Sequence, residues 1–265
     1  MLEAMHGYRL FGREWMALVW QRLRGRRVIG YLGCAGGGNI GDDAVFLGMQ
    51  SLRSDVRFRP VVLCGRSLLR VVRRLPTKLP GLPNSVVLGG GTLISRMGLT
   101  GVQRSLDMGQ TLWCCGTGVG SCGWGEEVEG DMILWPGLLN QFKAIAVRGP
   151  DSRQNLETLG LRDVEVCGDL ALALTKNRVS DPDGTTRLGV NVSLPIRQEK
   201  INGPALVAAL VELARTKQAE GWSILPLAMD PADIQPLRTF CGELGLPNDL
   251  ILYADPLTTI AKLAG

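Results

Sequence analysis

The chain has 265 residues, of which 45% are hydrophobic and 20% are charged. This composition is typical of a globular protein of one or two domains and excludes a disordered or collagen-like chain. The net charge of +4 suits anionic small molecules and is too small to predict nucleic-acid binding. Seven cysteines lack the Cys-x-x-Cys spacing of a zinc site, so we expect reduced thiols, a cytoplasmic location and no metal. The chain has no run of eighteen apolar residues, so we predict no membrane-spanning helix.

A basic segment opens the chain. Residues 8–24 mix tryptophans and aliphatic side chains with arginines, which predicts an amphipathic helical extension over residues 1–25. In one interpretation its apolar face packs on the first domain. In the other it makes peripheral contact with an anionic membrane surface, which would place the protein at the inner face of the membrane.

The next element is a short apolar strand over residues 28–32, followed by a glycine-rich loop and a helix over residues 44–52. Glycines allow the loop backbone to approach a ligand closely, and the N–H groups at a helix start can bind an anion or a sugar hydroxyl. The simpler interpretation is a flexible turn whose aspartates only cap the helix. The candidate site residues here are Gly36, Gly37, Asn39, Gly41, Asp42 and Asp43.

Further strands are predicted at residues 60–65, 85–88, 110–115, 144–147 and 164–169, with helices between them. Several of these strands end in residues that suit ligand binding, namely Gly90, Gly91, Thr92, Gly118, Arg148 and Asp169. Alternation of strands and helices predicts a parallel, doubly wound sheet, which binds ligands beyond the carboxyl ends of its strands. A dinucleotide is not expected, because the strand after Gly118 ends in an arginine and not in a ribose-binding acid.

The polar residues 175–186 predict a linker, and a second α/β segment follows it. Strands are expected at residues 188–194, 222–227 and 250–253, with helices at 205–219, 231–244 and 256–263. We therefore predict an α/β protein with a first Rossmann-like lobe over residues 26–178 and a second, incomplete lobe over residues 186–265.

Six segments, taken in order, resemble the polysaccharide pyruvyl transferase family. They are GYLGCAGGGNIGDDAVF (30–46), VVLGGGTLI (86–94), GTGVGSCG (116–123), AVRGPDSRQNLETLG (146–160), VEVCGDLALAL (164–174) and LGVNVSLP (188–195). The resemblance implies a glycosyltransferase-B-like arrangement of two lobes with the active site in the cleft between them. It also implies transfer of a pyruvyl group from phosphoenolpyruvate to paired hydroxyls of a sugar, in a cell-surface polysaccharide or its lipid-linked precursor. Phosphoenolpyruvate is then the donor substrate, and no cofactor is expected.

This chemistry assigns roles to the candidate residues, and several of them also have a simpler structural alternative. Asp42 or Asp43 would act as the base or bind acceptor hydroxyls, and Arg148 and Arg197 would bind the oxyanions of the donor. The arginines otherwise form surface ion pairs. Binding of the sugar is assigned to Asp169, with a loop anchor as its alternative, and Asn191 and Ser193 are expected to face the cleft.

One family motif is missing from the given residues. Family members continue with an Arg-x-His motif in the second lobe, whereas this sequence stops at Gly265 and has His6 as its single histidine. We therefore expect a C-terminally truncated chain, with transfer activity in a longer chain that carries the motif. The alternatives are a glycosyltransferase of the same two-lobe plan that uses a nucleotide sugar, and a non-catalytic sugar-binding remnant.

Overall fold

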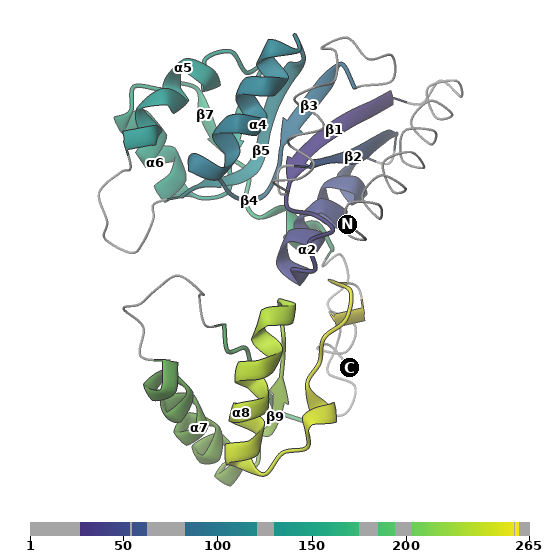
Figure 1. The fold of residues 1–265 in the computed structure, drawn as a ribbon, viewed down its shortest axis with the longest axis vertical. Coiled ribbons are helices and arrows are strands. Elements are labelled where there is room, and N and C mark those ends of the chain that lie inside the picture. The colour runs from purple at the N-terminus through teal and green to yellow at the C-terminus, as the bar shows by residue number, and fades with distance from the viewer. Residues whose placement is uncertain are drawn as a thin grey trace, which may run out of the picture. The chain divides into compact units, whose positions relative to one another are not determined.

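A computed structural model describes residues 27–53, 55–62, 83–120, 130–174, 185–193, 203–256 and 258–259 (Figure 1). These residues form two compact units. The first contains the described residues up to Ala35 and those between Val45 and Thr175, and the second contains Gly36–Ala44 and those after Lys176. The predicted N-terminal helix, most of the linker and Arg197 lie outside the described residues. The glycosyltransferase-B-like arrangement and the predicted lobe boundaries stay predictions.

The first unit is built on a seven-stranded sheet in which every pairing between the described strands is parallel. The spatial order is β2-β1-β3-β5-β6-β7, and β4 adds to β5. Both neighbours of β1 follow it in the chain, so the winding direction reverses there, as in a doubly wound sheet. The predicted α/β class with a parallel sheet is confirmed. The strands are β1 (Arg27–Gly33), β2 (Val56–Val62), β3 (Ser85–Leu88), β4 (Gly91–Ile94), β5 (Thr111–Val119), β6 (Ile145–Val147) and β7 (Val164–Val166).

Helices cover both faces of this sheet because alternate side chains of each strand point to opposite faces. Val86 and Leu88 of β3 belong to one apolar core, and Val87 belongs to the other. The first core includes residues of α4 (Arg96–Asp107), of η1 (Gly130–Leu134) with the following α5 (Trp135–Leu139), and of α6 (Pro150–Thr158) (Figure 1). The second includes residues of α2 (Ile40–Leu52) and η2 (Leu170–Leu174).

Two glycine-rich segments that the sequence predicts as open loops are strands in part. The strand expected to end at residue 115 continues to Val119, and the residues after β3 form β4, which pairs with it. Gly116, with a φ of 73°, lies at the point where the register between β5 and β6 shifts. Gly91 and Gly118 therefore lie in paired strands at the carboxyl edge of the sheet.

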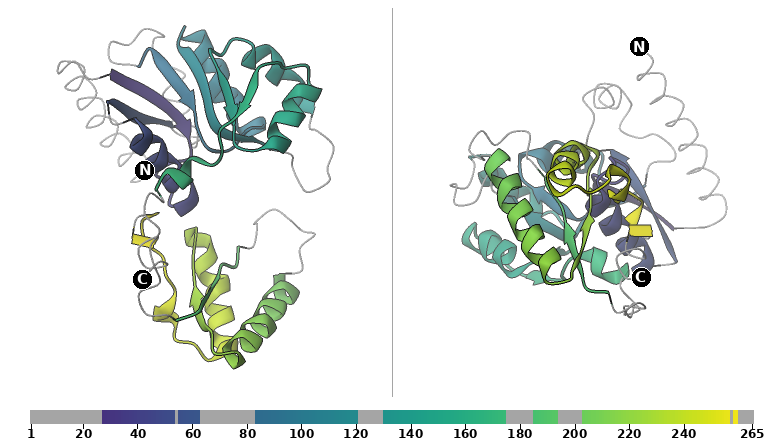
Figure 2. Two further views of the ribbon diagram at one scale, coloured as in Figure 1. Left: turned by 180° about the vertical axis from the view of Figure 1, so that it is seen from behind. Right: turned by 90° about the horizontal axis from the view of Figure 1, so that it is seen from below.

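The second unit contains the parallel pair β8 (Arg187–Val190) and β9 (Ser223–Pro226), with α7 (Gly203–Ala219) and α8 (Ile234–Leu244) (Figure 2). Both helices share one apolar core with the strands. A short turn, η3 (Pro231–Asp233), precedes α8, and Gly245 ends that helix with a φ of 67°, as expected of a C-terminal glycine. The third strand predicted for this unit is reduced to a single bridge between Leu227 and Leu252, after η4 (Asn248–Leu250).

Within the described ranges, none of the helices has the length and apolar character needed to cross a membrane.

Candidate functional site

Arg148 lies at the carboxyl edge of the large sheet, directly after β6. Its backbone N–H donates to the carbonyl of Thr117 at 2.8 Å. Its Nη2 atom lies 3.2 Å from the place that a Cβ would take at Gly118, and Thr92 Cγ2 lies 3.3 Å from the same place. Gly118 thus lets a guanidinium and a threonine approach the strand closely. The structure brings together Gly91, Thr92, Gly118 and Arg148, which the sequence placed in separate segments.

Asp169 joins this group as the ion-pair partner of Arg148. Its Oδ2 lies 3.6 Å from Arg148 Nη1, and its Oδ1 accepts the N–H of Ala171 at 2.9 Å, where η2 begins. A half-exposed pair of this kind stabilises a fold by only about 0–1 kcal/mol, so its main effect is to orient the arginine. The Arg148 side chain stays 39% exposed. Its five N–H donors are therefore only partly used and can bind a phosphate or a carboxylate.

Two thiols lie near the same edge. Cys167 follows β7 and is exposed, and a hydrogen bond with the Cys115 thiol lowers the pKa of Cys167 to about 7. The same bond, followed by burial, raises the pKa of Cys115, which therefore keeps its proton. Cys167 precedes Asp169 by two residues, so a label on this thiol would report on the edge that carries Arg148.

Gly90 has a packing role in addition to its predicted place in the site. A Cβ at this position would lie 2.0 Å from Cγ1 of the buried Val45. The neighbouring Gly89, like Gly33 at the end of the adjacent strand β1, lies against the ring of Tyr31, where an added Cβ would come within 2.1 and 2.2 Å of ring atoms. The Tyr31 hydroxyl accepts the N–H of Gly90 at 3.2 Å. Close packing thus accounts for glycine at these three positions.

The glycine-rich loop before α2 is a separate group, which belongs to the second unit. Asn39 Oδ1 accepts the N–H groups of Gly41 at 2.9 Å and Asp42 at 3.2 Å, so Asn39 is the residue that caps the helix. Asp43 Oδ1 accepts the N–H of Gly36 at 2.6 Å and closes the loop. Gly36 has a φ of 80° and Gly37 is exposed. Asn39 and Asp43 therefore hold the loop in shape.

Asp42 differs from its neighbour. It is partly buried, and no hydrogen bond or ion pair joins its carboxylate to another described residue. Burial raises the pKa of Asp42, and the charges of Asp43 and Asp230 raise it further. The positive end of α2 favours the ionised form, but these effects outweigh it. A carboxylate that has no partner among the described residues and has raised proton affinity is the residue type expected of a general base.

The carboxyl end of β8 carries Asn191 and Ser193. The Asn191 amide donates to the carbonyl of Leu227 at 2.8 Å and to Oδ2 of Asp233 at 3.0 Å. Asp233 is buried and also accepts the N–H groups of Met229 and Asp230, each at 3.0 Å. Asn191 therefore stabilises the turn after β9. Ser193 is exposed, and its hydroxyl makes no hydrogen bond to the described part of the chain.

Sequence reasoning missed Tyr31, Thr117, Asp230 and Tyr253. Asp230 was open to prediction, because an aspartate before Pro231 and after a strand is typical of a helix N-cap, and its side chain does accept the N–H of Ala232. Tyr31 and Thr117 are buried, and the sequence alone does not distinguish them from ordinary core positions. Tyr253 is the last residue of the strand predicted at 250–253, of which the structure keeps a single bridge at Leu252, so its position depends on tertiary structure.

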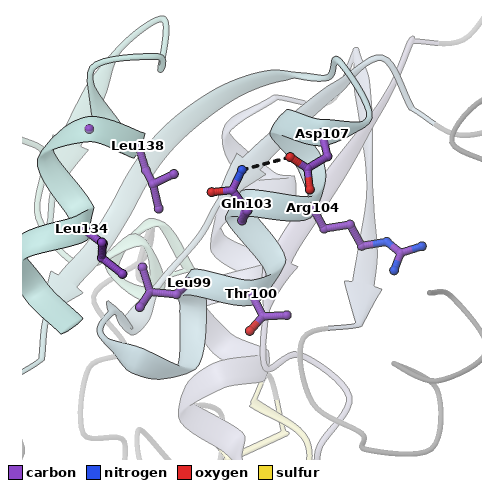
Figure 3. A pocket seen from close by; sticks show the side chains of 8 residues that line it. Leu99, Thr100, Gln103, Arg104, Asp107, Leu134 and Leu138 are labelled. Atoms are coloured by element: carbon purple, nitrogen blue, oxygen red, sulfur yellow. Dashed lines mark hydrogen bonds between the residues drawn. The ribbon is translucent and has the colours of Figure 1, made fainter.

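A pocket of about 570 Å³ lies elsewhere in the first unit, between α4 and α5 (Figure 3). Leu99, Leu134 and Leu138 line its apolar part, and the amide of Gln103 donates to Asp107 at 2.9 Å on its polar side. None of the predicted site residues lines it. Within the described ranges, no group of three or more His, Cys, Asp or Glu side chains is arranged to hold a metal ion.

A parallel, doubly wound sheet with polar side chains at its carboxyl edge defines an α/β protein of the Rossmann-like class. The sequence model of the polysaccharide pyruvyl transferase family matches residues 39–264, and the chain belongs to this family. No curated protein matches the chain.

One solved structure with similarity to the chain is that of a protein from Klebsiella pneumoniae subsp. pneumoniae NTUH-K2044, described as functional and uncharacterized. The sequences are 11% identical, the match covers 96% of this chain and 100% of that chain, and the TM-score is 0.42. A likeness at this level says nothing about activity.

Proposed function

We propose that the protein transfers a pyruvyl group from phosphoenolpyruvate to two hydroxyls of one sugar, in a cell-surface polysaccharide or its lipid-linked precursor. The observation that carries the proposal is the family match, which spans residues 39–264. The residues described above support it, because they include a partly exposed arginine for an anion and a carboxylate whose pKa is raised by burial.

The reaction makes defined demands on a site. A proton adds to the methylene carbon of phosphoenolpyruvate, and a sugar hydroxyl bonds to the neighbouring carbon while giving up its own proton. Phosphate then leaves, and the second hydroxyl bonds to the same carbon and loses its proton, which completes the ketal. The products are the ketal and inorganic phosphate. The site must therefore hold the donor oxyanions, deprotonate hydroxyls and supply an acid.

Arg148 is proposed to bind the phosphate or the carboxylate of the donor. Its position beside Gly118 and Asp169 orients the guanidinium, and its exposure leaves N–H donors for forked hydrogen bonds. Arg197 has the same proposed role and lies outside the described residues. Thr92 and Gly91 are proposed to contact the donor through the adjoining strand.

Asp42 is proposed to accept the proton of an acceptor hydroxyl. The loop that carries it has a shape fixed by Asp43 and Asn39, which accept the N–H groups of Gly36 and Gly41. Gly37 is exposed between them and is proposed to contact sugar hydroxyls. Because Asp43 is engaged with Gly36, we assign the base to Asp42 and the loop closure to Asp43.

The test is calorimetric titration of phosphoenolpyruvate into the natural chain, carried through any residues that follow Gly265. Arg148→Ala should weaken the affinity roughly 10-fold or more, because a charged hydrogen-bonding group is lost. Arg153→Ala is the control, since Arg153 is an exposed arginine that pairs with Glu157 on α6. If the natural chain binds a nucleotide sugar and ignores phosphoenolpyruvate, the glycosyltransferase alternative replaces the proposal.

A further inference from the structure

The loop formed by Gly36–Gly41 is held from outside by three contacts within the second unit. The Tyr253 hydroxyl donates to the carbonyl of Gly38 at 2.7 Å. The N–H of Ile40 donates to the carbonyl of Met229 at 2.7 Å. Pro231 packs so closely that its Cγ lies 3.3 Å from the place of a Cβ on Gly38, which has a φ of 91°.

The three contacts come from two segments, the turn that carries Met229 and Pro231 and the segment that carries Tyr253, and each segment is itself held in place. The turn that carries Met229 is held by the buried Asp233 and by the capping box of Asp230. Tyr253 follows Leu252, whose N–H donates to the carbonyl of Pro226 and whose carbonyl accepts the N–H of Ala228, both at 2.9 Å. The tyrosine hydroxyl is therefore presented to the loop by backbone that is anchored to β9.

Within the described part of the chain, the Tyr253 side chain contributes little to the packing of the second unit. The residue is 40% exposed and does not belong to the apolar core of the second unit. A glycine-rich segment adopts many conformations on its own, so specific bonds are needed to keep one of them. The bond to Gly38 is such a bond, and it lies four residues before Asp42.

We propose that Tyr253 is a positioning residue, whose hydroxyl holds the glycine loop in the conformation that presents Asp42 to the acceptor. Its effect on catalysis rests on the proposed function, whereas its effect on the loop does not. Tyr253 does not take part in the chemical steps. It acts through the backbone of Gly38.

The test compares Tyr253→Phe with Thr239→Val in the full natural chain. Each substitution removes one hydroxyl from the second unit, and the Thr239 hydroxyl donates only within α8, to the carbonyl of Gln235. Hydrogen exchange followed at the N–H groups of Ile40, Gly41 and Asp42 should become roughly fivefold faster in Tyr253→Phe, as expected for the loss of one hydrogen bond. Exchange in α7 and α8 should be unchanged, and Thr239→Val should leave the loop as in the wild type.

Kinetics provide the second readout. Tyr253→Phe should raise the KM for the sugar acceptor several-fold and leave the KM for phosphoenolpyruvate unchanged. Unchanged exchange at the loop, or faster exchange throughout the unit with a lower Tm, would overturn the positioning role. If exchange at the loop rises as expected while the wild type transfers no pyruvyl group, the proposed function fails and the role of Tyr253 in the loop stands.

Discussion

Asp42 and Asp43 are adjacent, yet their carboxylates have opposite roles. Asp43 accepts the N–H of Gly36 at 2.6 Å and so stabilises the loop. Asp42 is partly buried beside two like charges, and burial is the largest cause of its raised pKa. The folded protein thus disfavours the ionised carboxylate of Asp42. Such perturbed side chains are candidates for function, because they are often found at active sites.

The raised pKa of Asp42 predicts an unusual pH dependence. The folded protein holds this proton to a higher pH than the unfolded chain, whose aspartates titrate near the ordinary value of 3.8. The stability contributed by Asp42 is therefore lost as the pH rises from 3.8 through the folded pKa. Asp42→Asn should raise the Tm at pH 7, and the difference should vanish below about pH 3.8.

Thermal unfolding of the wild type and Asp42→Asn over this pH range measures the effect, with Asp249→Asn as an exposed control in the same unit. The variant should also lose pyruvyl transfer. A lower Tm for Asp42→Asn at every pH would show that the carboxylate stabilises the fold.

Substitution of Gly90 is expected to destabilise the fold. Its added Cβ in Gly90→Ala would meet Val45 Cγ1 at 2.0 Å, so overpacking should lower the free energy of unfolding by about 1–3 kcal/mol. Gly137→Ala is the control, since Gly137 is exposed and has nothing within 4 Å of the new Cβ. Urea unfolding measures both variants, and Val45→Ala in the Gly90→Ala background should restore part of the loss. No rescue would mean that the constraint at Gly90 is not packing against Val45.

At the level of elements, the paired strands β4 and β5 carry Thr92 and Gly118, the residues that lie beside the Arg148 guanidinium. The extended part of β5 brings Thr117 into the core, where its hydroxyl oxygen accepts the N–H of Leu93 at 3.2 Å. Glycine content favoured loops in these segments, because glycine is depleted in strands. Pairing with a neighbouring strand outweighed that preference, and the sequence holds no local signal for such a contact.

Thr117 provides a test of this pairing. Thr117→Val keeps the shape of the side chain and removes the acceptor of a buried N–H group, which should cost about 1–3 kcal/mol of unfolding free energy. Thr117→Ser keeps the hydroxyl and should cost less. Equal unfolding free energies for the two variants in urea would contradict a role for the hydroxyl in joining β4 to β5.

At the scale of the molecule, the sequence predicted the parallel sheet, the order of its strands along the chain and the helices α7 and α8. Strong apolar runs and helix signals such as Gly245 carry that information locally. The grouping of Arg148 with Gly118 and Asp169 followed from the rule that carboxyl ends of parallel strands share one edge.

Tertiary contacts determine the rest of the site. The loop residues Gly36–Ala44 belong to the second unit although they are 140 or more positions away in the chain from most of it. Their partners Met229 and Tyr253 carry no motif that links them to a glycine-rich loop. The different roles of Asp42 and Asp43 depend on the hydrogen bond between Asp43 and Gly36, which the sequence does not show.

We propose above all that the protein forms a pyruvyl ketal from phosphoenolpyruvate. The most direct measurement follows phosphoenolpyruvate labelled with carbon-13 in its methylene group, incubated with the natural chain and a sugar acceptor that carries free hydroxyl pairs. We predict a new ketal methyl signal in the NMR spectrum, one phosphate released for each ketal, and neither product when the acceptor is left out. Phosphate release without a ketal, or no consumption of phosphoenolpyruvate across a panel of cell-surface sugars and lipid-linked precursors, would contradict pyruvyl transfer.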